Sequence, residues 1–312
     1  MIFTANRQTT SRILMVRPAS FGFNPETASS NAFQKDDQAA DKQEISEKAI
    51  KEFDQMVESL RDHHVDVTVI QDSKEPEKPD AVFPNNWIST QTGGTIYTYP
   101  MESPARRLEY RPNILDELGE RFSVNAVFDF SDKADDEIFL EGTGSMILDR
   151  VNKIVYACTS PRTHEKLLLQ WAKVSGYKPI IFQATDEKGQ AIYHTNVLMG
   201  LGTNYVVICL EAIKNPSQRR QLVESFRNTE MDIVEISLDQ MMGFAGNVLE
   251  VENKFGDLYL LLSQSAFEEL RDDQKKIIER YAKLLPFNIP TIEKYGGGSV
   301  RCMVAELFLE PR

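Results

Sequence analysis

The chain has 312 residues, of which 41% are hydrophobic and 26% are charged, a balance typical of a water-soluble globular protein. Its formal net charge of -12 argues against nucleic acid and anionic lipid as partners, because both require a basic surface. No apolar stretch approaches the roughly 20 residues that span a bilayer. We therefore expect no membrane segment and a cytoplasmic location.

Cysteine usage points to a reducing compartment. The three cysteines, Cys158, Cys209 and Cys302, lie far apart in the sequence, and they form neither a disulfide framework nor a metal-ligand cluster at a recognised spacing. We therefore expect no bound metal and no cofactor.

The first expected helix covers residues 46–62 and is followed by a strand at 65–69, where valine alternates with polar residues. The apolar face of this helix consists of Ile50, Phe53, Val57 and Leu60. A second helical signal runs from Pro104 to Phe122 with an interruption at Pro112, and an apolar stretch at 124–130 follows it. Both segments predict a helix followed by a strand.

The third and fourth units carry helix-start signals. Ser160 is expected as an N-cap with Pro161 at the first helical position, and the helix ends at Gly176 before a strand at 180–182. Asn215 and Pro216 open the fourth helix by the same device, with its strand at 233–236. A fifth helix is expected over 265–285, with a strand at 287–292.

These five units begin about 50 to 58 residues apart, which is typical of a repeat architecture. Each unit is followed by a loop of small and polar residues, and one marker residue recurs in these loops at about 53 to 55 residues. The marker residues are Asn86, Glu141, His194, Asn247 and Cys302. Equal spacing predicts an α/β propeller of five units, pseudo-fivefold symmetric, with all five markers at one central site.

No linker divides the chain. Residues 28–45 and 72–79 are poor in apolar positions and are interpreted as solvated loops. Neither segment is long enough to separate domains, so we expect a single domain over residues 1–312.

Cys302 stands directly after a run of glycines and Arg301, in the segment 296–303. Glycine allows close approach of the backbone to a ligand, and a neighbouring cation raises the thiolate fraction of a cysteine. This pattern favours a nucleophile. The alternative is core packing beside Met303 and Val304, since cysteine is often buried.

A thiolate, an imidazole and a carboxylate are the parts of a nucleophilic site. His194 is the histidine that falls on the repeat period, whereas His63 and His64 follow a helix end and His164 lies near a helix start. Glu141 ends an apolar strand, where a carboxylate can accept hydrogen bonds from a planar guanidinium or urea. Its alternative is a solvated strand end.

The segment Gly296 to Met303 resembles the cysteine signature of arginine deiminases, and the segment Pro100 to Arg106 resembles a deiminase segment whose arginine holds the substrate carboxylate. Over essentially its whole length the chain resembles the guanidine-modifying enzymes of the pentein fold. The resemblance implies that Cys302 attacks the guanidino or ureido carbon, His194 protonates the departing nitrogen and then activates water, and Glu141 binds substrate N–H groups.

Two positions depart from the arginine deiminase pattern. That pattern has aspartate where this chain has Asn86 and Asn196, and asparagine can both donate to and accept from a neutral urea. The sequence His194-Thr195-Asn196 resembles the dihydrolase branch, and the nearest family by resemblance is the citrulline-utilization hydrolases. We therefore expect cysteine-dependent hydrolysis of arginine or citrulline, with release of ammonia and ornithine as the end product.

Several residues keep two interpretations. Asn247 lines the pocket or serves a turn beside Gly246, and Arg106 is a substrate ligand or an ordinary surface charge. Arg301 tunes Cys302 electrostatically or forms a salt bridge elsewhere. Cys158 and Cys209 are interpreted as buried small hydrophobic residues.

Other functions stay open at the level of sequence. An arginine deiminase would stop at citrulline, and an amidinotransferase would pass the same covalent intermediate to an amine. A non-catalytic module would bind a basic amino acid without needing a nucleophile, and a cysteine protease lacks a local signature here. The expected partner is a small guanidino or ureido compound, with a homo-oligomer as a further expectation.

Overall fold

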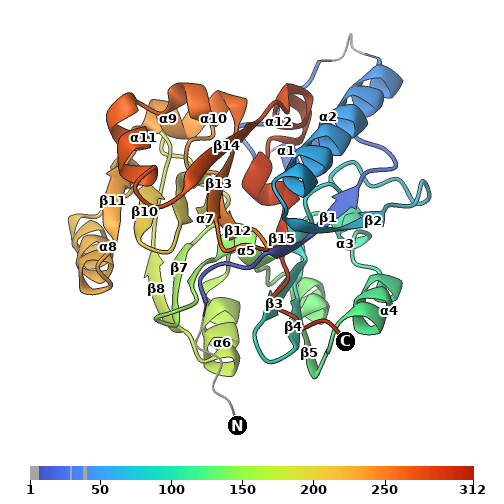
Figure 1. The fold of residues 1–312 in the computed structure, drawn as a ribbon, viewed down its shortest axis with the longest axis horizontal. Coiled ribbons are helices and arrows are strands. Elements are labelled where there is room, and N and C mark those ends of the chain that lie inside the picture. The colour runs from blue at the N-terminus through green and yellow to red at the C-terminus, as the bar shows by residue number, and fades with distance from the viewer. Residues whose placement is uncertain (1–6, 29, 38–40) are drawn as a thin grey trace.

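A computed structural model describes residues 7–28, 30–37 and 41–312 and contains five three-stranded sheets arranged in a ring (Figure 1). Each sheet has the same plan: an inner strand pairs antiparallel with a middle strand, and an outer strand pairs parallel with that middle strand. The ring of five repeated α/β units confirms the predicted fold class.

The strands fall into three sets by their place in each sheet. The inner strands are β15 (Ala305–Glu306), β3 (Ile88–Gln91), β6 (Ile147–Asp149), β9 (Met199–Leu201) and β12 (Leu249–Glu252). The middle strands are β1 (Arg12–Arg17), β4 (Thr95–Thr98), β7 (Ile154–Cys158), β10 (Tyr205–Ile208) and β13 (Leu258–Ser263). The outer strands are β2 (Asp66–Gln71), β5 (Ala126–Asp129), β8 (Lys178–Phe182), β11 (Asp232–Glu235) and β14 (Lys283–Phe287).

Helices connect each middle strand to its parallel outer strand, as parallel pairing requires. They are α2 (Lys42–Asp62), α4 (Pro112–Arg121), α6 (Glu165–Ser175), α8 (Pro216–Asn228) and the pair α10 (Gln264–Glu269) and α11 (Asp272–Ile278). Two shorter helices, α1 (Pro25–Ala28) and α3 (Pro104–Arg107), lie in the same kind of connection, ahead of α2 and α4. The other short helices precede inner strands and are α5 (Gly142–Ser145), α7 (Thr195–Leu198), α9 (Leu238–Met242) and α12 (Pro290–Gly296). Four 3₁₀ turns complete the described elements: η1 (Pro84–Asn86), η2 (Ser131–Asp136), η3 (Leu210–Ala212) and η4 (Val300–Met303).

The two ends of the chain close the ring in one sheet. The inner strand β15 comes from the C-terminal end and pairs with β1 from the N-terminal end, with Ile13 opposite Glu306. Neighbouring inner strands also lie against one another, as for β6 with β9 and β15 with β3. The inner strands therefore line the centre of the ring, and the loops that precede them converge there.

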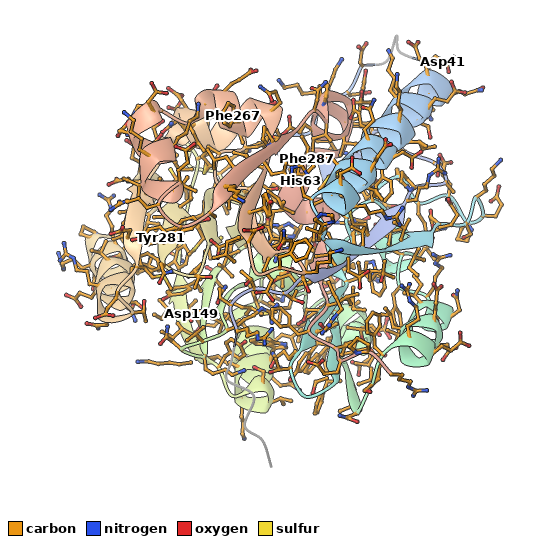
Figure 2. All side chains as sticks on the ribbon, viewed as in Figure 1. Asp41, His63, Asp149, Phe267, Tyr281 and Phe287 are labelled. Carbon is orange, nitrogen blue, oxygen red and sulfur yellow. The ribbon has the colours of Figure 1, made fainter. Side chains whose placement is uncertain are left out.

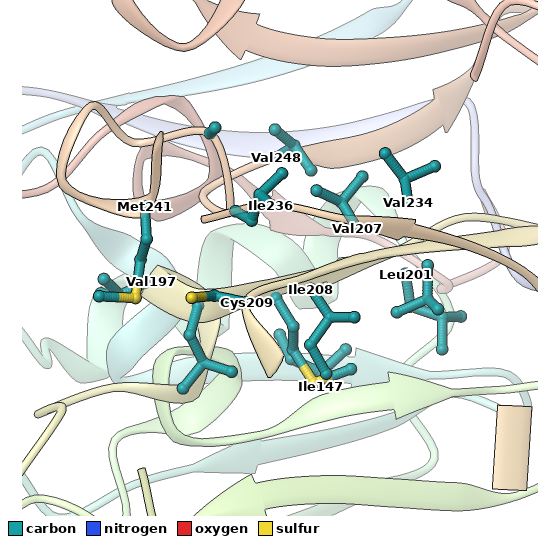
Figure 3. Packing of buried hydrophobic residues seen from close by; sticks show 14 of the residues in the cluster. Ile147, Val197, Leu201, Val207, Ile208, Cys209, Val234, Ile236, Met241 and Val248 are labelled. Atoms are coloured by element: carbon teal, nitrogen blue, oxygen red, sulfur yellow. The ribbon is translucent and has the colours of Figure 1, made fainter. Parts of the chain in front are cut away.

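Buried apolar side chains form clusters that hold the sheets and helices together, and Figure 2 draws the described side chains on the ribbon. Phe226 of α8 and Trp171 of α6 are fully buried, as the helical spacing of apolar residues requires. Cys209 lies in the large cluster around β10 together with Val207, Ile208 and Ile236 (Figure 3). Cys158 belongs to the same cluster, so both cysteines are buried residues, as predicted.

The expected start of the third helix is wrong. Ser160 and Thr163 exchange backbone hydrogen bonds in a short bridge, and α6 begins only at Glu165. The Ser160 hydroxyl donates to the Tyr193 carbonyl at 2.7 Å and accepts from the Arg162 N–H at 3.1 Å. The hydroxyl therefore shapes a turn in the loop that presents Arg162, instead of capping a helix.

The single fifth helix expected over 265–285 is also wrong. Leu270 adopts an extended conformation with φ −68 and ψ 128, which divides the segment into α10 and α11. The expected strand at 287–292 lies earlier, in β14, because Leu284 and Leu285 pair with Leu260 and Leu261 of β13. A short apolar run in a sequence fits either a helix face or a strand. Strand pairing in the folded protein decides between the two.

The segment 28–45 differs from the expected solvated loop in its described part. Asn31, Phe33 and Gln34 are buried, and α2 begins within this range, at Lys42. Residues 29 and 38–40 lie outside the described residues. Among the helices that the structure describes, none has the length and apolar character needed to cross a membrane.

Candidate active site

The five marker residues all occur just before an inner strand. Asn86 ends η1 before β3, Glu141 precedes α5 and β6, His194 precedes α7 and β9, Asn247 precedes β12, and Cys302 lies in η4 before β15. Figure 1 shows α5, β12 and β15 at the centre of the ring. The predicted equivalence of these loops is therefore seen in the fold.

Cys302 is held by a short and rigid segment. Gly297 has a φ of 62°, a conformation that favours glycine, and the backbone N–H of Cys302 donates to the Ser299 carbonyl at 2.9 Å. The Ser299 hydroxyl donates to the buried Glu293 carboxylate at 2.7 Å. Burial raises the pKa of Glu293, although hydrogen bonds from neighbouring serine hydroxyls act in the opposite direction.

Cys302 is 3% exposed. Its sulfur lies between the side-chain amides of Asn196 and Asn247. Asn196 Nδ2 donates to Sγ at 3.4 Å, and Asn247 Nδ2 donates to Sγ at 3.3 Å. Asn247 Nδ2 also donates to the Asn196 carbonyl at 3.0 Å. Sγ can itself donate to Asn247 Oδ1 at 3.6 Å, so the two amides fix the position of the sulfur.

His194 and Glu141 form a buried pair. The Nε2 atom of His194 lies 2.7 Å from Oε2 of Glu141, and both residues are at most 2% exposed. Burial lowers the pKa of His194 to about 4, although the hydrogen bond with Glu141 opposes this shift. The imidazole is therefore neutral at pH 7, and its Nε2 carries the hydrogen that faces the carboxylate.

Glu141 stays ionised because cations surround it. Burial alone would raise the pKa of Glu141, but Arg162, the bond with His194 and Arg106 lower it to about 2. Nη1 of Arg162 lies 3.8 Å from Oε2, and Nη1 of Arg106 lies 4.0 Å from the same atom. The other oxygen accepts the backbone N–H of Glu102 at 2.9 Å. Both carboxylate oxygens of Glu141 therefore contact protein groups in this structure.

Arg106 is buried in an ion pair rather than exposed at the surface. Its Nε and Nη2 donate to the two oxygens of Glu109 at 2.8 and 3.0 Å, and its Nη1 donates to Asn86 Oδ1 at 3.0 Å. Bidentate pairing fixes the plane of a guanidinium. Asp80 Oδ2 lies 3.8 Å from Nε, and its Oδ1 is buried without a partner among the described residues.

Arg162 is a second buried arginine at this site, and sequence reasoning missed it. Its Nη2 donates to the Thr27 carbonyl at 3.1 Å and to the Ser30 hydroxyl at 2.6 Å. The guanidinium also lies 5.0 Å from the centre of the Tyr193 ring, within the range of a cation–π contact. Arg162 therefore connects the central pair to the segment that contains α1.

One pocket brings these groups together. Of the predicted site residues, Cys302, His194, Asn86 and Arg106 line it; Asn196 and Asn247 contact the Cys302 sulfur, and Glu141 lies behind His194. The remaining lining residues are Thr27, Asn31, Asp80, Phe83, Arg162, Tyr193, Gly296, Gly297 and Gly298.

Thr27 and Asn31 cover one side of this pocket. Asn31 Nδ2 donates to the Gly297 carbonyl at 3.2 Å, next to the glycines that precede Cys302. The sequence does not indicate a role for Thr27 and Asn31, because only the folded ring brings them to the pocket. Asp80 carried a weak signal, since it lies just before the polar loop that begins at Phe83, whereas Arg162 lies far from each of the repeating polar loops.

The described residues contain no group of three or more His, Cys, Asp and Glu side chains that could hold a metal ion. The cysteines at 158, 209 and 302 are all unpaired. The pocket and the residues around it offer a thiol, an imidazole, amides and buried ion pairs.

A family model described as "N,N dimethylarginine dimethylhydrolase, eukaryotic" matches residues 17–309. The chain belongs to this family, and its fold is the pentein fold of guanidine-modifying enzymes. No curated protein sequence shows significant similarity to the chain.

Solved structures of low sequence identity share the fold. The N-terminal domain of ArgZ, an arginine dihydrolase of the ornithine–ammonia cycle in cyanobacteria, is 16% identical with a TM-score of 0.74, over 95% of this chain and 97% of that one. A dimethylarginine dimethylaminohydrolase variant, in an adduct with S-methyl-L-thiocitrulline, is 17% identical with a TM-score of 0.62, over 96% and 100%. In the full ArgZ chain the match covers 41% of its length, at 18% identity and a TM-score of 0.72.

The ionisation of His194 can be tested directly. We expect its imidazole to stay neutral until about pH 4, because burial outweighs the bond to Glu141. Glu141→Gln should lower this pKa further, since the carboxylate is what favours the protonated ring. Imidazole carbon chemical shifts recorded against pH measure both values, with His194→Asn to assign the signal.

The lowered pKa of His194 also determines how the stability of the folded state changes with pH. The unfolded chain takes up this proton near pH 6.5, whereas the folded chain does so at about 4, so the folded state loses stability as the pH falls through that window. A His194 signal that titrates near pH 6.5 would contradict the assigned pair.

Proposed function

We propose that this protein is a cysteine-dependent hydrolase of C–N bonds that converts a citrulline-like ureido amino acid to ornithine, carbon dioxide and ammonia. The observation that carries the proposal is the neutral lining around the nucleophile. Asn196 and Asn247 contact the Cys302 sulfur, Asn86 lines the same pocket, and His194 is neutral. A ureido group carries no charge and suits such a lining.

Unpartnered atoms of these amides complement a ureido group. Asn86 Nδ2 and Asn196 Oδ1 are buried without a hydrogen-bond partner among the described residues. Buried polar atoms are normally satisfied, so a ligand with one acceptor and N–H donors would remove their desolvation cost. The ureido oxygen can accept from Asn86, and a ureido N–H can donate to Asn196.

The charged residues of the pocket fit the amino-acid end of the substrate. Arg106 and Arg162 both line the pocket, and a guanidinium binds a carboxylate through paired hydrogen bonds. The free Oδ1 of Asp80 can accept from an α-ammonium group. Burial raises the pKa of Asp80, and a bound cation would favour its ionised form.

The first half of the reaction forms a thiocarbamate. As Cys302 Sγ adds to the ureido carbon, its proton passes to the neutral His194. The protonated imidazole then delivers that proton to the terminal nitrogen, the C–N bond breaks, and ammonia leaves. Glu141 orients the ring and stabilises its transient positive charge.

The second half returns the enzyme to its starting state. His194 takes a proton from a water molecule that adds to the thiocarbamate carbon, and the C–S bond breaks with return of the proton to sulfur. The product is an N-carboxylate of ornithine, which loses carbon dioxide to give the free amine. One water is consumed, so citrulline and water yield ornithine, carbon dioxide and ammonia.

A second candidate is hydrolysis of a methylated arginine, which the family description favours. ArgZ has been captured with its product, and one variant of it is covalently bound to a reaction intermediate; these facts support a covalent mechanism on this fold. An arginine deiminase and an amidinotransferase use the same covalent logic and remain alternatives for the assay.

We further propose a reducing, cytoplasmic environment, because the mechanism needs a free thiol at Cys302 and all three cysteines are unpaired. The substrate is the proposed small-molecule partner. Assembly into a homo-oligomer stays a prediction.

Product analysis tests the proposed reaction. Purified protein supplied with L-citrulline should release ornithine and ammonia, and Cys302→Ala should reduce turnover by at least about a thousandfold because the nucleophile is lost. Cys209→Ala is the matched control, since it removes another buried cysteine outside the pocket. Ammonia and amino-acid products are measured in parallel with L-arginine and Nω,Nω-dimethylarginine.

The outcomes separate the candidates. Citrulline that accumulates from arginine and is itself inert would make the protein a deiminase, and dimethylamine from dimethylarginine with inert citrulline would favour the second candidate. Turnover that requires an added amine such as glycine would indicate an amidinotransferase.

The neutral amide at position 86 should set the preference for a ureido group. Asn86→Asp places a carboxylate beside Arg106 and toward the substrate head group, so we expect kcat/KM for arginine relative to citrulline to rise by about tenfold. Asn86→Ala is the control that removes the amide without adding charge. An unchanged ratio in Asn86→Asp would contradict this role.

A further inference from the structure

A small hollow lies at the other end of the inner strands from the active site. Gln91 ends β3, Arg150 follows β6 and Phe308 follows β15, whereas the active-site loops precede these same strands. None of the residues that line the hollow lines the substrate pocket. We call it the rear hollow and define it by six of its lining residues: Arg7, Gln91, Arg150, Lys153, Tyr177 and Phe308.

The rear hollow is lined by positive charge, although the protein has a net charge of -12. Arg7, Arg150 and Lys153 line it, and no carboxylate among the described residues does so. Arg150 is 4% exposed, and its guanidinium lies 4.0 Å from the centre of the Phe308 ring. Nζ of the half-buried Lys153 lies 4.6 Å from the centre of the Tyr177 ring. Burial and the charge of Arg150 lower the pKa of Lys153, and no acid opposes this shift.

The carboxylates close to the rear hollow already have partners. Glu306 Oε2 lies 3.3 Å from Arg150 Nη2 and 3.2 Å from Arg301 Nη2, so two guanidiniums share one acid. Both oxygens of Asp149, which is labelled in Figure 2, accept hydrogen bonds from Asn152 in the same turn. Glu306 therefore balances only one of its two guanidiniums, and Asp149 is occupied by its own turn.

Two buried donors of the rear hollow lack a hydrogen-bond partner among the described residues. They are Nε2 of Gln91 and the hydroxyl of Tyr177, and these residues are 7% and 5% exposed. Burial raises the pKa of Tyr177, so the hydroxyl keeps the proton that it can donate. Buried polar groups are normally hydrogen-bonded, and a ligand that accepts from both groups would remove the cost of leaving them unpaired.

Protein contacts fix the position of these groups. Gln8 Nε2 donates to the Leu148 carbonyl at 2.9 Å, and Gln8 Oε1 accepts from the Arg150 backbone N–H at 2.9 Å. Nη1 of Arg150 donates to the Thr90 carbonyl at 3.2 Å. The N-terminal segment is thereby tied to β3 and β6, and the donors of the rear hollow are arranged before any ligand binds. Such preorganisation lowers the cost of binding.

We propose that the rear hollow binds a tetrahedral oxyanion, of which the phosphate group is the type, through its cations and its two unpartnered donors. Guanidinium, ammonium, amide and hydroxyl groups all donate to phosphate oxygens. This site lies apart from the substrate pocket, so the inference goes beyond the proposed function and does not depend on it. Because the anion would join the N-terminal segment, two sheets and the C-terminal segment, its binding should stabilise the closed ring.

Calorimetric titration of the full chain with inorganic phosphate tests the proposal. The titration is made without an amino-acid substrate and at constant ionic strength set with sodium chloride, because exposed charges are screened by salt. We expect saturable binding and a rise of the thermal unfolding midpoint with phosphate concentration. Glycerol phosphate carries the same group as an ester, and bicarbonate is a planar oxyanion; both are titrated in parallel.

Single substitutions locate the binding. Lys153→Met removes a cation and keeps a long side chain, and it should weaken phosphate binding by at least about tenfold. Tyr177→Phe removes only the unpartnered hydroxyl and should weaken binding by about fivefold. Lys178→Met is the matched control, since this exposed lysine is close in sequence but does not line the rear hollow; its effect should stay below about twofold.

The outcomes decide between this site and others. Absence of saturable binding would overturn the proposal, and so would binding that is unchanged in Lys153→Met and Tyr177→Phe, because the anion would then lie elsewhere, such as on the arginines of the substrate pocket. An equal loss in Lys178→Met would indicate general attraction by surface charge and would also overturn it. If Tyr177→Phe fails to fold, Lys153→Met decides alone.

The comparison of anions identifies the ligand. Bicarbonate that binds more tightly than phosphate would reject a tetrahedral ligand and overturn the proposal. Phosphate that binds more tightly than glycerol phosphate would support a site for the free ion, and the reverse order would support a site for a phosphate ester. Substrate turnover does not enter these titrations, so failure of the proposed function would leave their result unchanged.

Discussion

The central constraint on this molecule is the burial of the Glu141 carboxylate. A buried ionised acid is strongly unfavourable unless cations and donors surround it, and here Arg162, Arg106, the His194 ring and the Glu102 N–H do so. These groups come from different loops, so the carboxylate is satisfied only when the ring is closed. The same cluster fixes the tautomer of His194, and it thereby joins the folding of the ring to the chemistry of the site.

The ring concentrates polar residues at its centre and leaves some of their atoms, such as Asn86 Nδ2 and Asn196 Oδ1, without a hydrogen-bond partner among the described residues. Each loop delivers its side chain just before a short inner strand, and the amide side chains of Asn196 and Asn247 meet the sulfur of Cys302. The pocket in front of the nucleophile is lined by the amide of Asn86 and by the charged side chains of Asp80, Arg106 and Arg162. On this account the amides face the ureido group, and the charged residues face the amino-acid end of the substrate.

Sequence periodicity predicted the architecture because every repeat obeys the same rule of helix, outer strand and polar loop. It located all five marker residues, yet it misplaced elements where local signals were ambiguous: Ser160 looked like a helix cap but shapes the turn that presents Arg162, and Leu284 looked helical but belongs to β14. Arg162 and Asn31 escaped notice because their importance comes from contacts between segments distant in sequence. Spacing along the chain carries no information about such contacts.

The most direct test of the account is mass analysis of rapidly quenched reactions with L-citrulline, in wild-type protein and in His194→Gly. Without the imidazole, the departing nitrogen is not protonated, so His194→Gly should form no covalent species and serves as the control. The account predicts, in the wild type, a mass increase equal to citrulline less ammonia on the peptide that contains Cys302. An adduct on another residue, or no adduct in the wild type while it turns over at saturating substrate, would contradict it.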